Sequence, residues 1–194
     1  MTTKWFCFIV MALFAGFWSP AQANTHMGLA VGLVQDQRTT SSKDTLQNTL
    51  IDGYLFTPLF KTKSFFLGAE YMLITTSMPN GADDQTATLT ANNPMMALKL
   101  NLDRNGNFSV SGMGSPSVTA TYNVTGGVAN DTWTGVAYAG KFSYHAEISQ
   151  MWRVSTSITY FSATYSSKSS TSTSSVSSFS RTLLIPSLGL EVYF

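Results

Sequence analysis

The chain has 194 residues, with 11 Lys and Arg against 10 Asp and Glu, and a formal net charge of +1. Such a nearly neutral chain gives no electrostatic reason to bind nucleic acid, and a single cysteine excludes an internal disulfide framework. Charged residues make up only 11% of the chain, whereas soluble proteins average about 25%. No apolar run beyond residue 23 is long enough for a membrane helix, so the low charge indicates β-structure in contact with lipid.

Residues 1–23 have the layout of a secretory signal peptide. Lys4 supplies a positive charge, an apolar run extends over residues 5–17, and Ala21 and Ala23 form the A-x-A pattern that signal peptidase recognises. A membrane-spanning helix would need about 20 apolar residues, and this run is shorter. We therefore expect secretion followed by cleavage after Ala23.

The mature chain, residues 24–194, is expected to form a single domain and lacks Cys7, the only cysteine. Apolar side chains alternate along it with small or polar ones, as Leu29, Val31 and Leu33 do near its start. Period two is a strand signal, and strands of about 9–11 residues match the length that crosses a bilayer at a tilt. The pattern predicts strands at residues 27–35, 48–57, 64–75, 94–103, 107–124, 133–149, 154–165 and 181–194.

The connections between these strands alternate in length. The longer, polar ones are residues 36–47, 76–93, 125–132 and 166–180, and the short ones are 58–63, 104–106 and 150–153. Short periplasmic turns and longer extracellular loops are typical of outer-membrane barrels. The sequence thus predicts an all-β fold, an antiparallel up-and-down transmembrane β-barrel of eight strands with both termini on the periplasmic side.

The fifth predicted strand contains an interruption. Apolar residues between Phe108 and Val124 share one parity, but the segment from Gly112 to Pro116 separates them. We expect one long strand with a kink or bulge, because the parity resumes unchanged after the interruption. In the alternative, the interruption is a turn, residues 133–149 are split as well, and the barrel has ten strands.

The last strand carries the most specific resemblance. Leu188, Leu190, Val192 and the terminal Phe194 lie on one face. This looks like the final-strand signal of outer-membrane barrels, which implies recognition by the barrel-assembly machinery, although valine stands where tyrosine is common. With eight strands and four loops, residues 24–194 resemble the OmpA-type transmembrane domain and the opacity-type surface antigens. The resemblance implies a location in the bacterial outer membrane.

Charged and polar residues occupy the strand positions that alternate with the outward apolar residues, so they line the inner face of the predicted barrel. These candidates for a lumenal polar network are Asp52, Glu70, Lys99, Lys141, His145, Glu147 and Glu191. A charge in a low-dielectric lumen must be paired or neutralised, so we expect a network that plugs the barrel. Glu70 and Lys99 fall on adjacent predicted strands at similar depth, which predicts an ion pair between them.

Ser143, His145 and Glu147 share one face of a strand and raise the question of catalysis. Same-face neighbours on a strand are about 6.6–7 Å apart, which is too far for the hydrogen bond that a nucleophile and its base need. Outer-membrane lipid A deacylases resemble this set, but their substrate is in the outer leaflet and this strand descends to the periplasmic side. We therefore predict that the protein is not an enzyme and has no catalytic, cofactor-binding or metal-binding residues.

Residues 166–180 are almost entirely Ser and Thr, a composition that cannot bury a core. At the cell surface this segment fits a contact site for a host or phage ligand, and equally a loop that only joins two strands. The first predicted function is structural or surface interaction, such as adhesion or envelope integrity. A small channel for hydrophobic or ionic solutes comes second and a lipid A-modifying hydrolase third. Expected partners are outer-membrane lipid, lipopolysaccharide and the assembly machinery, with the chain itself a monomer.

Overall fold

The computed structural model describes residues 25–37, 45–59, 64–80, 85–124, 131–169 and 178–194. The expected signal peptide, with Ala21 and Ala23, lies outside these residues, as does most of the predicted Ser/Thr-rich loop. Within the described part of the chain, no helix is long and apolar enough to cross a membrane.

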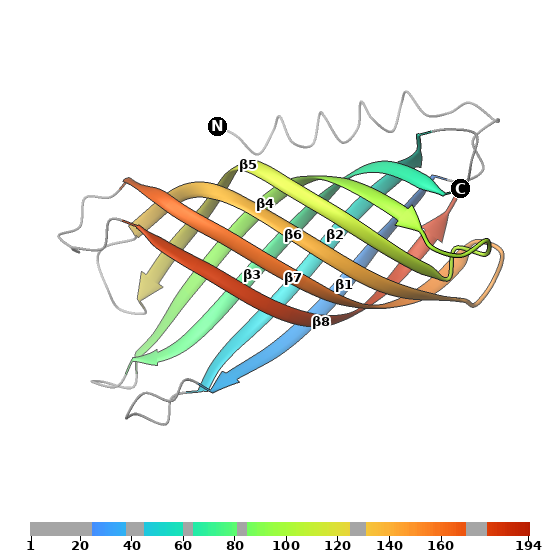
Figure 1. The fold of residues 1–194 in the computed structure, drawn as a ribbon. Coiled ribbons are helices and arrows are strands. Elements are labelled where there is room, and N and C mark those ends of the chain that lie inside the picture. Colours follow the sequence, from blue (N-terminus) through green and yellow to red (C-terminus); the bar gives the residue numbers. More distant parts are fainter. Residues whose placement is uncertain (1–24, 38–44, 60–63, 81–84, 125–130, 170–177) are drawn as a thin grey trace.

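Eight antiparallel strands form a closed barrel, in which each strand pairs with its neighbours along the chain and β8 pairs with β1 (Figure 1). The strands are β1 (His26–Gln37), β2 (Thr45–Pro58), β3 (Phe65–Asn80), β4 (Gln85–Asn101), β5 (Phe108–Val124), β6 (Asp131–Glu147), β7 (Trp152–Ser169) and β8 (Phe179–Tyr193). This confirms the predicted all-β, up-and-down barrel of eight strands. The ten-stranded alternative is wrong.

β4 begins at Gln85, although the sequence pattern predicted a strand from residue 94 and a loop over residues 76–93. The pairing of β3 with β4 continues without a shift as far as Asn80, which pairs with Gln85. In the added part of β4, Ala87 and Ala91 are buried inside the barrel, and threonines alternate with them. Because Ala and Thr differ little in hydropathy, this alternation leaves only a faint trace in the sequence.

β5 contains the irregularity that its sequence predicted. Ser115 pairs with Ala137 and Val118 with Gly135, so β5 has one more residue than β6 between these two pairs. One long strand with a bulge is therefore confirmed, but the expectation of unchanged parity is wrong. An inserted residue exchanges the two faces of a strand, and Val118 and Ala120 accordingly lie buried inside the barrel.

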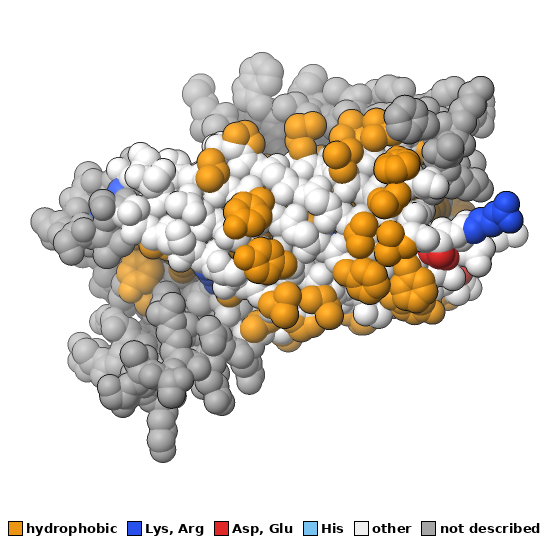
Figure 2. Space-filling view, in the orientation of Figure 1, with side chains coloured by type: hydrophobic (Ala, Val, Ile, Leu, Met, Phe, Trp, Pro, Cys, Tyr) orange, Lys and Arg blue, Asp and Glu red, His pale blue; other side chains and the backbone are white. Residues whose placement is uncertain are grey.

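The outer wall of the barrel is apolar. More than half of the surface of several outward side chains is exposed, namely Leu29, Val31, Leu98, Tyr138 and Leu188. Figure 2 shows such side chains spread over the wall, with exposed charged side chains near its ends. An exterior with so many exposed large apolar side chains is the inverse of a soluble protein surface, while the interior holds buried charges.

Both ends of the described chain lie at the same end of the barrel, which we call the turn end. The backbone N–H of Phe194 donates to the carbonyl of Thr25 at 2.9 Å. The short turns 102–107 and 148–151 lie at this end, because they follow β4 and β6. Gly106 has a φ of +70°, a conformation that favours glycine and allows the tight turn after β4.

Candidate functional site

Lys141, on β6, lies at the centre of the lumen and pairs with two carboxylates from the opposite wall. Its Nζ is 2.5 Å from Oδ2 of Asp52 on β2, and it also pairs with Oε1 of Glu70 on β3. Nζ lies 5.0 Å from the ring centroid of Tyr54. All three charged side chains are buried, so loss of Lys141 would leave two carboxylates without a cation in a poorly solvated site.

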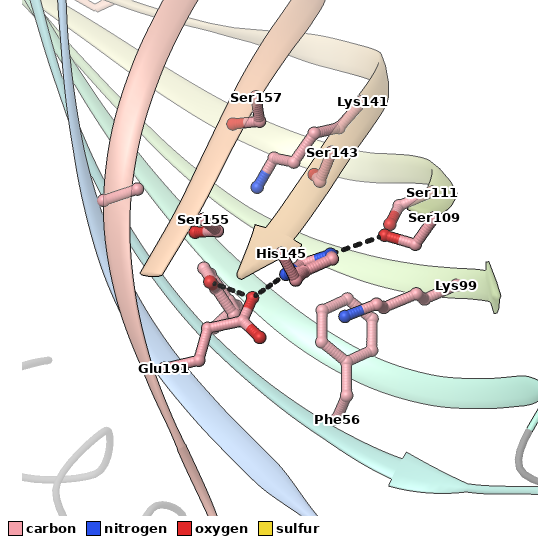
Figure 3. Close-up of a pocket in the computed structure, with 12 residues that line it drawn as sticks. Phe56, Lys99, Ser109, Ser111, Lys141, Ser143, His145, Ser155, Ser157 and Glu191 are labelled. Atoms are coloured by element: carbon pink, nitrogen blue, oxygen red, sulfur yellow. Dashed lines mark hydrogen bonds and ion pairs between the residues drawn. The ribbon is translucent and has the colours of Figure 1, made fainter. Parts of the chain in front are cut away.

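Glu191, on β8, is the centre of a second cluster, nearer the turn end (Figure 3). Tyr54 donates its hydroxyl to Oε1 at 2.6 Å, and Tyr193 donates to Oε2 at 3.2 Å. Nδ1 of His145 lies 3.0 Å from Oε1, and Nε2 of the same ring lies 2.9 Å from Oγ of Ser109. The buried carboxylate thus accepts hydrogen bonds from tyrosines of β2 and β8 and lies beside the imidazole of β6, and burial of a charge requires such partners.

Lys99, on β4, contacts His26, and the predicted ion pair of Lys99 with Glu70 is wrong. Nζ of Lys99 is 3.0 Å from Nε2 of His26. The register pairs Glu70 with Met95 and Phe66 with Lys99, which places Lys99 and Glu70 about 13 Å apart along the strand direction. The two residues therefore belong to different clusters of the lumen.

An aromatic layer covers Lys99 on the side of the turn end. The ring of His26 stacks on Tyr193, with 4.7 Å between centroids, and on Phe56 at 5.5 Å. Phe66 meets the same ring edge-on at 5.2 Å. His26, Phe56 and Phe66 are all buried, so this layer separates the inner clusters from the mouth of the barrel.

Glu147 lies at the rim of the barrel and outside the buried network, which corrects its predicted place in that network. Its side chain is 56% exposed, and Oε2 lies 3.7 Å from Nη2 of Arg153. Arg153 also donates to the carbonyl of Gly106 at 3.3 Å and lies over the ring of Tyr193. Glu147 is the last residue of β6, so it reaches solvent although its parity is that of the inner face. A cavity of about 340 Å³, lined in part by Arg104, Arg153 and Tyr193, opens here.

The other half of the lumen is mostly apolar, and Arg181 makes several polar contacts there. Arg181 donates to Oδ1 of Asn48 at 2.7 Å and also to Oγ1 of Thr76, which itself donates to Asn48 at 2.7 Å. Around these contacts lies a buried cluster that includes Leu50, Met72, Ile74, Phe161 and Tyr165.

Little space is left among the clusters nearer the turn end. A cavity of about 10 Å³, lined by Lys99, Ser109, Lys141, His145 and Glu191 among others, has room for about one water molecule. Sequence reasoning identified the charged members of this set but not Ser109, His26 or Arg181. Inward parity was the signal that could have found all three, because each shares the parity of the inner face of its strand.

The predicted assembly signal lies on the outer wall. Leu188, Leu190 and Phe194 are 60, 44 and 51% exposed, and Val192 is half-buried on the same face. Tyr193 points the other way, into the lumen, where it contacts His26 and Glu191. The recognition of this face by assembly machinery stays a prediction.

Two solved structures show the same architecture. The outer membrane protein OprG from Pseudomonas aeruginosa is 12% identical, with 89% of this chain and 97% of that chain covered and a TM-score of 0.49. Ail, the attachment invasion locus protein of Yersinia pestis, solved in complex with the heparin analogue sucrose octasulfate, is 10% identical, with 88% and 97% covered and a TM-score of 0.50. The chain has the fold of a small outer-membrane β-barrel. At these identities the likeness concerns the fold alone. No protein-family model matches the sequence, and no curated protein matches it.

Proposed function

We propose that the protein resides in a bacterial outer membrane as a closed β-barrel with a structural or surface-interaction role, such as adhesion or envelope integrity. The apolar outer wall supports the location, because lipid can solvate side chains such as Leu29, Leu98 and Leu188, which are 58, 58 and 60% exposed. A membrane strand must also have every backbone group paired, and the closed ring provides this.

The contact of Lys141 with Asp52 and Glu70 is the observation that favours a closed barrel over a channel. The contact joins opposite walls at the centre of the lumen, and the aromatic layer around His26 lies between it and the turn end. Eight strands enclose an interior that side chains fill. A solute path would need these groups to separate, which exposes buried charges to an apolar surrounding.

The surface role would be carried by the four connections at the end opposite the turn end. Their central residues, 38–44, 81–84, 125–130 and 170–177, lie outside the described residues, and the predicted contacts with lipopolysaccharide or with a host or phage ligand belong to this proposal. In the same proposal the barrel is a monomer, inserted by the barrel-assembly machinery after the signal peptide is removed.

Fractionation and conductance measurements test the two parts of this proposal. Mature protein that begins at Asn24 should fractionate with outer membranes and migrate differently on a gel before and after boiling. Recovery as a soluble periplasmic protein would contradict the location. In planar bilayers the purified barrel should give no long-lived conductance steps, and discrete steps from the unmodified protein would favour the channel.

A further inference from the structure

Ser109, His145 and Glu191 come from three different strands and meet in the lumen in the order of a nucleophile, a base and an orienting acid. Oγ of Ser109 is 2.9 Å from Nε2 of His145, and Nδ1 of the same ring is 3.0 Å from Oε1 of Glu191. The contact of Ser109 with His145 is a hydrogen bond, whereas the contact of His145 with Glu191 is short enough for one but lacks hydrogen-bond geometry. Catalytic contacts of this kind often become aligned only when substrate binds. This arrangement differs from the set on one strand that the sequence offered, in which Ser143 cannot reach His145.

The neighbours of Glu191 determine which atom carries the proton in each of these contacts. Tyr54 and Tyr193 donate to Glu191, which makes its carboxylate an acceptor. The proton of a neutral His145 ring then belongs on Nδ1, facing Glu191, because the partner of one ring nitrogen sets the state of the other. Nε2 is left as an acceptor, and the hydroxyl of Ser109 donates to it. This is the direction of proton movement that activation of a serine requires.

Positive charge lies in the same small cavity. Lys99 and Lys141 line it together with Ser109 and His145, and Figure 3 shows Lys99 extending into it beside the imidazole ring. A cation near a reacting carbonyl stabilises the oxyanion that develops in acyl transfer. Nζ of Lys141 is held by Asp52 and Glu70, which leaves Lys99 as the better placed cation for this role.

We propose that Ser109 is an acyl-accepting nucleophile, with His145 as its general base and Glu191 as the residue that positions His145. In the reaction, Oγ of Ser109 bonds to the carbonyl carbon of an ester while its proton moves to Nε2 of His145. The bond from that carbon to the leaving oxygen then breaks, and His145 returns the proton to the leaving alcohol. Water, activated by the same imidazole, releases the acid and restores the serine.

The size of the cavity restricts the substrate to small acyl groups. About 10 Å³ is free next to Ser109, room for about one water molecule, so every ester must displace the walls and the smallest acyl groups, such as acetyl, displace them least. Entry is shortest from the turn end, because Tyr193 lines the 340 Å³ mouth cavity and also donates to Glu191 from 3.2 Å. A long lipid acyl chain is therefore not the substrate of this site.

Methanesulfonyl fluoride, a small sulfonylating reagent, tests this proposal on the folded barrel. Attack by Oγ of Ser109 on its sulfur would expel fluoride and add one methanesulfonyl group, which mass spectrometry of peptides locates. We expect modification at Ser109 in the unmodified protein and at neither Ser111 nor Ser143, which line the same cavity. Absence of modification at Ser109, or equal modification of the three serines, would overturn the proposal.

Variants separate an activated serine from a merely accessible one. His145→Gln should slow modification of Ser109 by about 100-fold or more, the usual contribution of a general base, while Ser180→Ala should leave the rate unchanged, because Ser180 is exposed and contacts Thr164 outside the cavity. The rate in the unmodified protein should also rise with pH as His145 loses its proton, and Glu191→Gln should shift that profile, whereas Glu191→Asp should shift it less. The gel shift on boiling shows which variants are folded.

Unmodified protein should hydrolyse phenyl acetate faster than the folded Ser109→Ala variant, with Ser180→Ala, at an exposed position outside the cavity, as the matched control. Equal hydrolysis by the unmodified protein and Ser109→Ala, or an unchanged modification rate in folded His145→Gln, would show that the three residues serve packing alone. These readouts are obtained on the purified barrel, so they do not depend on its proposed role at the cell surface.

Discussion

Nζ of Lys141 lies 2.5 Å from Oδ2 of Asp52, on the opposite wall of the barrel. β2 and β6 are four strands apart in either direction around the ring, so this ion pair crosses the lumen and does not reinforce a neighbouring pair of strands. The same Nζ also contacts Glu70. One lysine therefore ties three strands together through the interior, in addition to the hydrogen bonds of the wall.

Replacement of Lys141 by Met should destabilise the barrel strongly. The change leaves Asp52 and Glu70 buried side by side without a cation, and breaking a buried ion pair costs about 3–5 kcal/mol when burial is complete. Urea unfolding in detergent or lipid vesicles, followed by the gel shift on boiling, measures the loss. Lys168→Met is the matched control: Lys168 pairs with Asp131 at 3.2 Å and has a 14% exposed side chain, and we expect a smaller loss.

Combined substitutions test which residues pair with Lys141 at the centre of the lumen. Asp52→Asn and Glu70→Gln together should recover part of the loss caused by Lys141→Met, because no uncompensated charge is then left in the lumen. Lys99→Met should not recover the loss caused by Glu70→Gln, since Lys99 contacts His26 instead. Recovery by Lys99→Met would instead indicate that Lys99 pairs with Glu70, in contradiction to the structure.

Phe194 and Tyr193 should differ in their effect on assembly. Phe194 is 51% exposed on the outer wall, whereas Tyr193 stacks on His26 inside the barrel. Deletion of Phe194, or its replacement by Asp, should lower the folded fraction in cells far more than Tyr193→Asp does. Quantifying folded and unfolded bands in outer-membrane fractions measures both, and equal effects would argue against recognition of the outward face.

The strands could be predicted from the sequence where large apolar residues alternate with small or polar ones. Leu29, Val31 and Leu33 show this well, because one face meets the exterior and the other the lumen. The start of β4 could not be predicted, since Ala87 and Ala91 differ little in hydropathy from the threonines between them. The bulge at Ser115 was foreseen as an irregularity, but a one-residue insertion reverses every later face, which periodicity alone does not reveal.

The interior residues could be predicted one by one, but their partners could not. Parity places Asp52, Glu70 and Lys141 on the inner face whatever the register is. Which of them are in contact depends on the position of each residue along the barrel axis and on contacts across the lumen. Neither can be derived from the local sequence. The meeting of Ser109 with His145 depends on the pairing of β5 with β6, so it also required the three-dimensional structure.

Asp103 stabilises the turn after β4 through backbone hydrogen bonds. Its Oδ1 accepts from the N–H of Phe108 at 2.7 Å, and its Oδ2 accepts from the N–H of Asn105 at 3.2 Å. These donors, that of Phe108 above all, hold the pKa of Asp103 below its ordinary value. A lowered pKa in the folded state means that the ionised form stabilises the turn.

The turn should therefore loosen in acid. The contribution of Asp103 is complete above the unfolded pKa of about 3.9 and is lost as the pH falls through the lowered folded value. Amide exchange at Asn105 and Phe108, corrected for the intrinsic effect of pH, should speed up in that range. Asp103→Asn should remove this pH dependence, and an unchanged profile in that variant would assign the effect to another group.

Gly135 and Gly140 lie on the same strand, and replacement by Ala should destabilise the barrel at Gly135 but not at Gly140. Gly135 sits where the register of β6 with β7 shifts, and a Cβ there would overlap the carbonyl oxygen of Thr164, whereas a Cβ on Gly140 meets nothing within 4 Å. Forced overlap with backbone costs about 1–3 kcal/mol, so Gly135→Ala should lower the free energy of unfolding by that amount. Gly140→Ala should change it by less than about 0.5 kcal/mol. Urea unfolding of both variants in the same vesicles decides the matter: if Gly135→Ala is as stable as Gly140→Ala, the close approach of β7 to Gly135 is not a feature of the folded barrel.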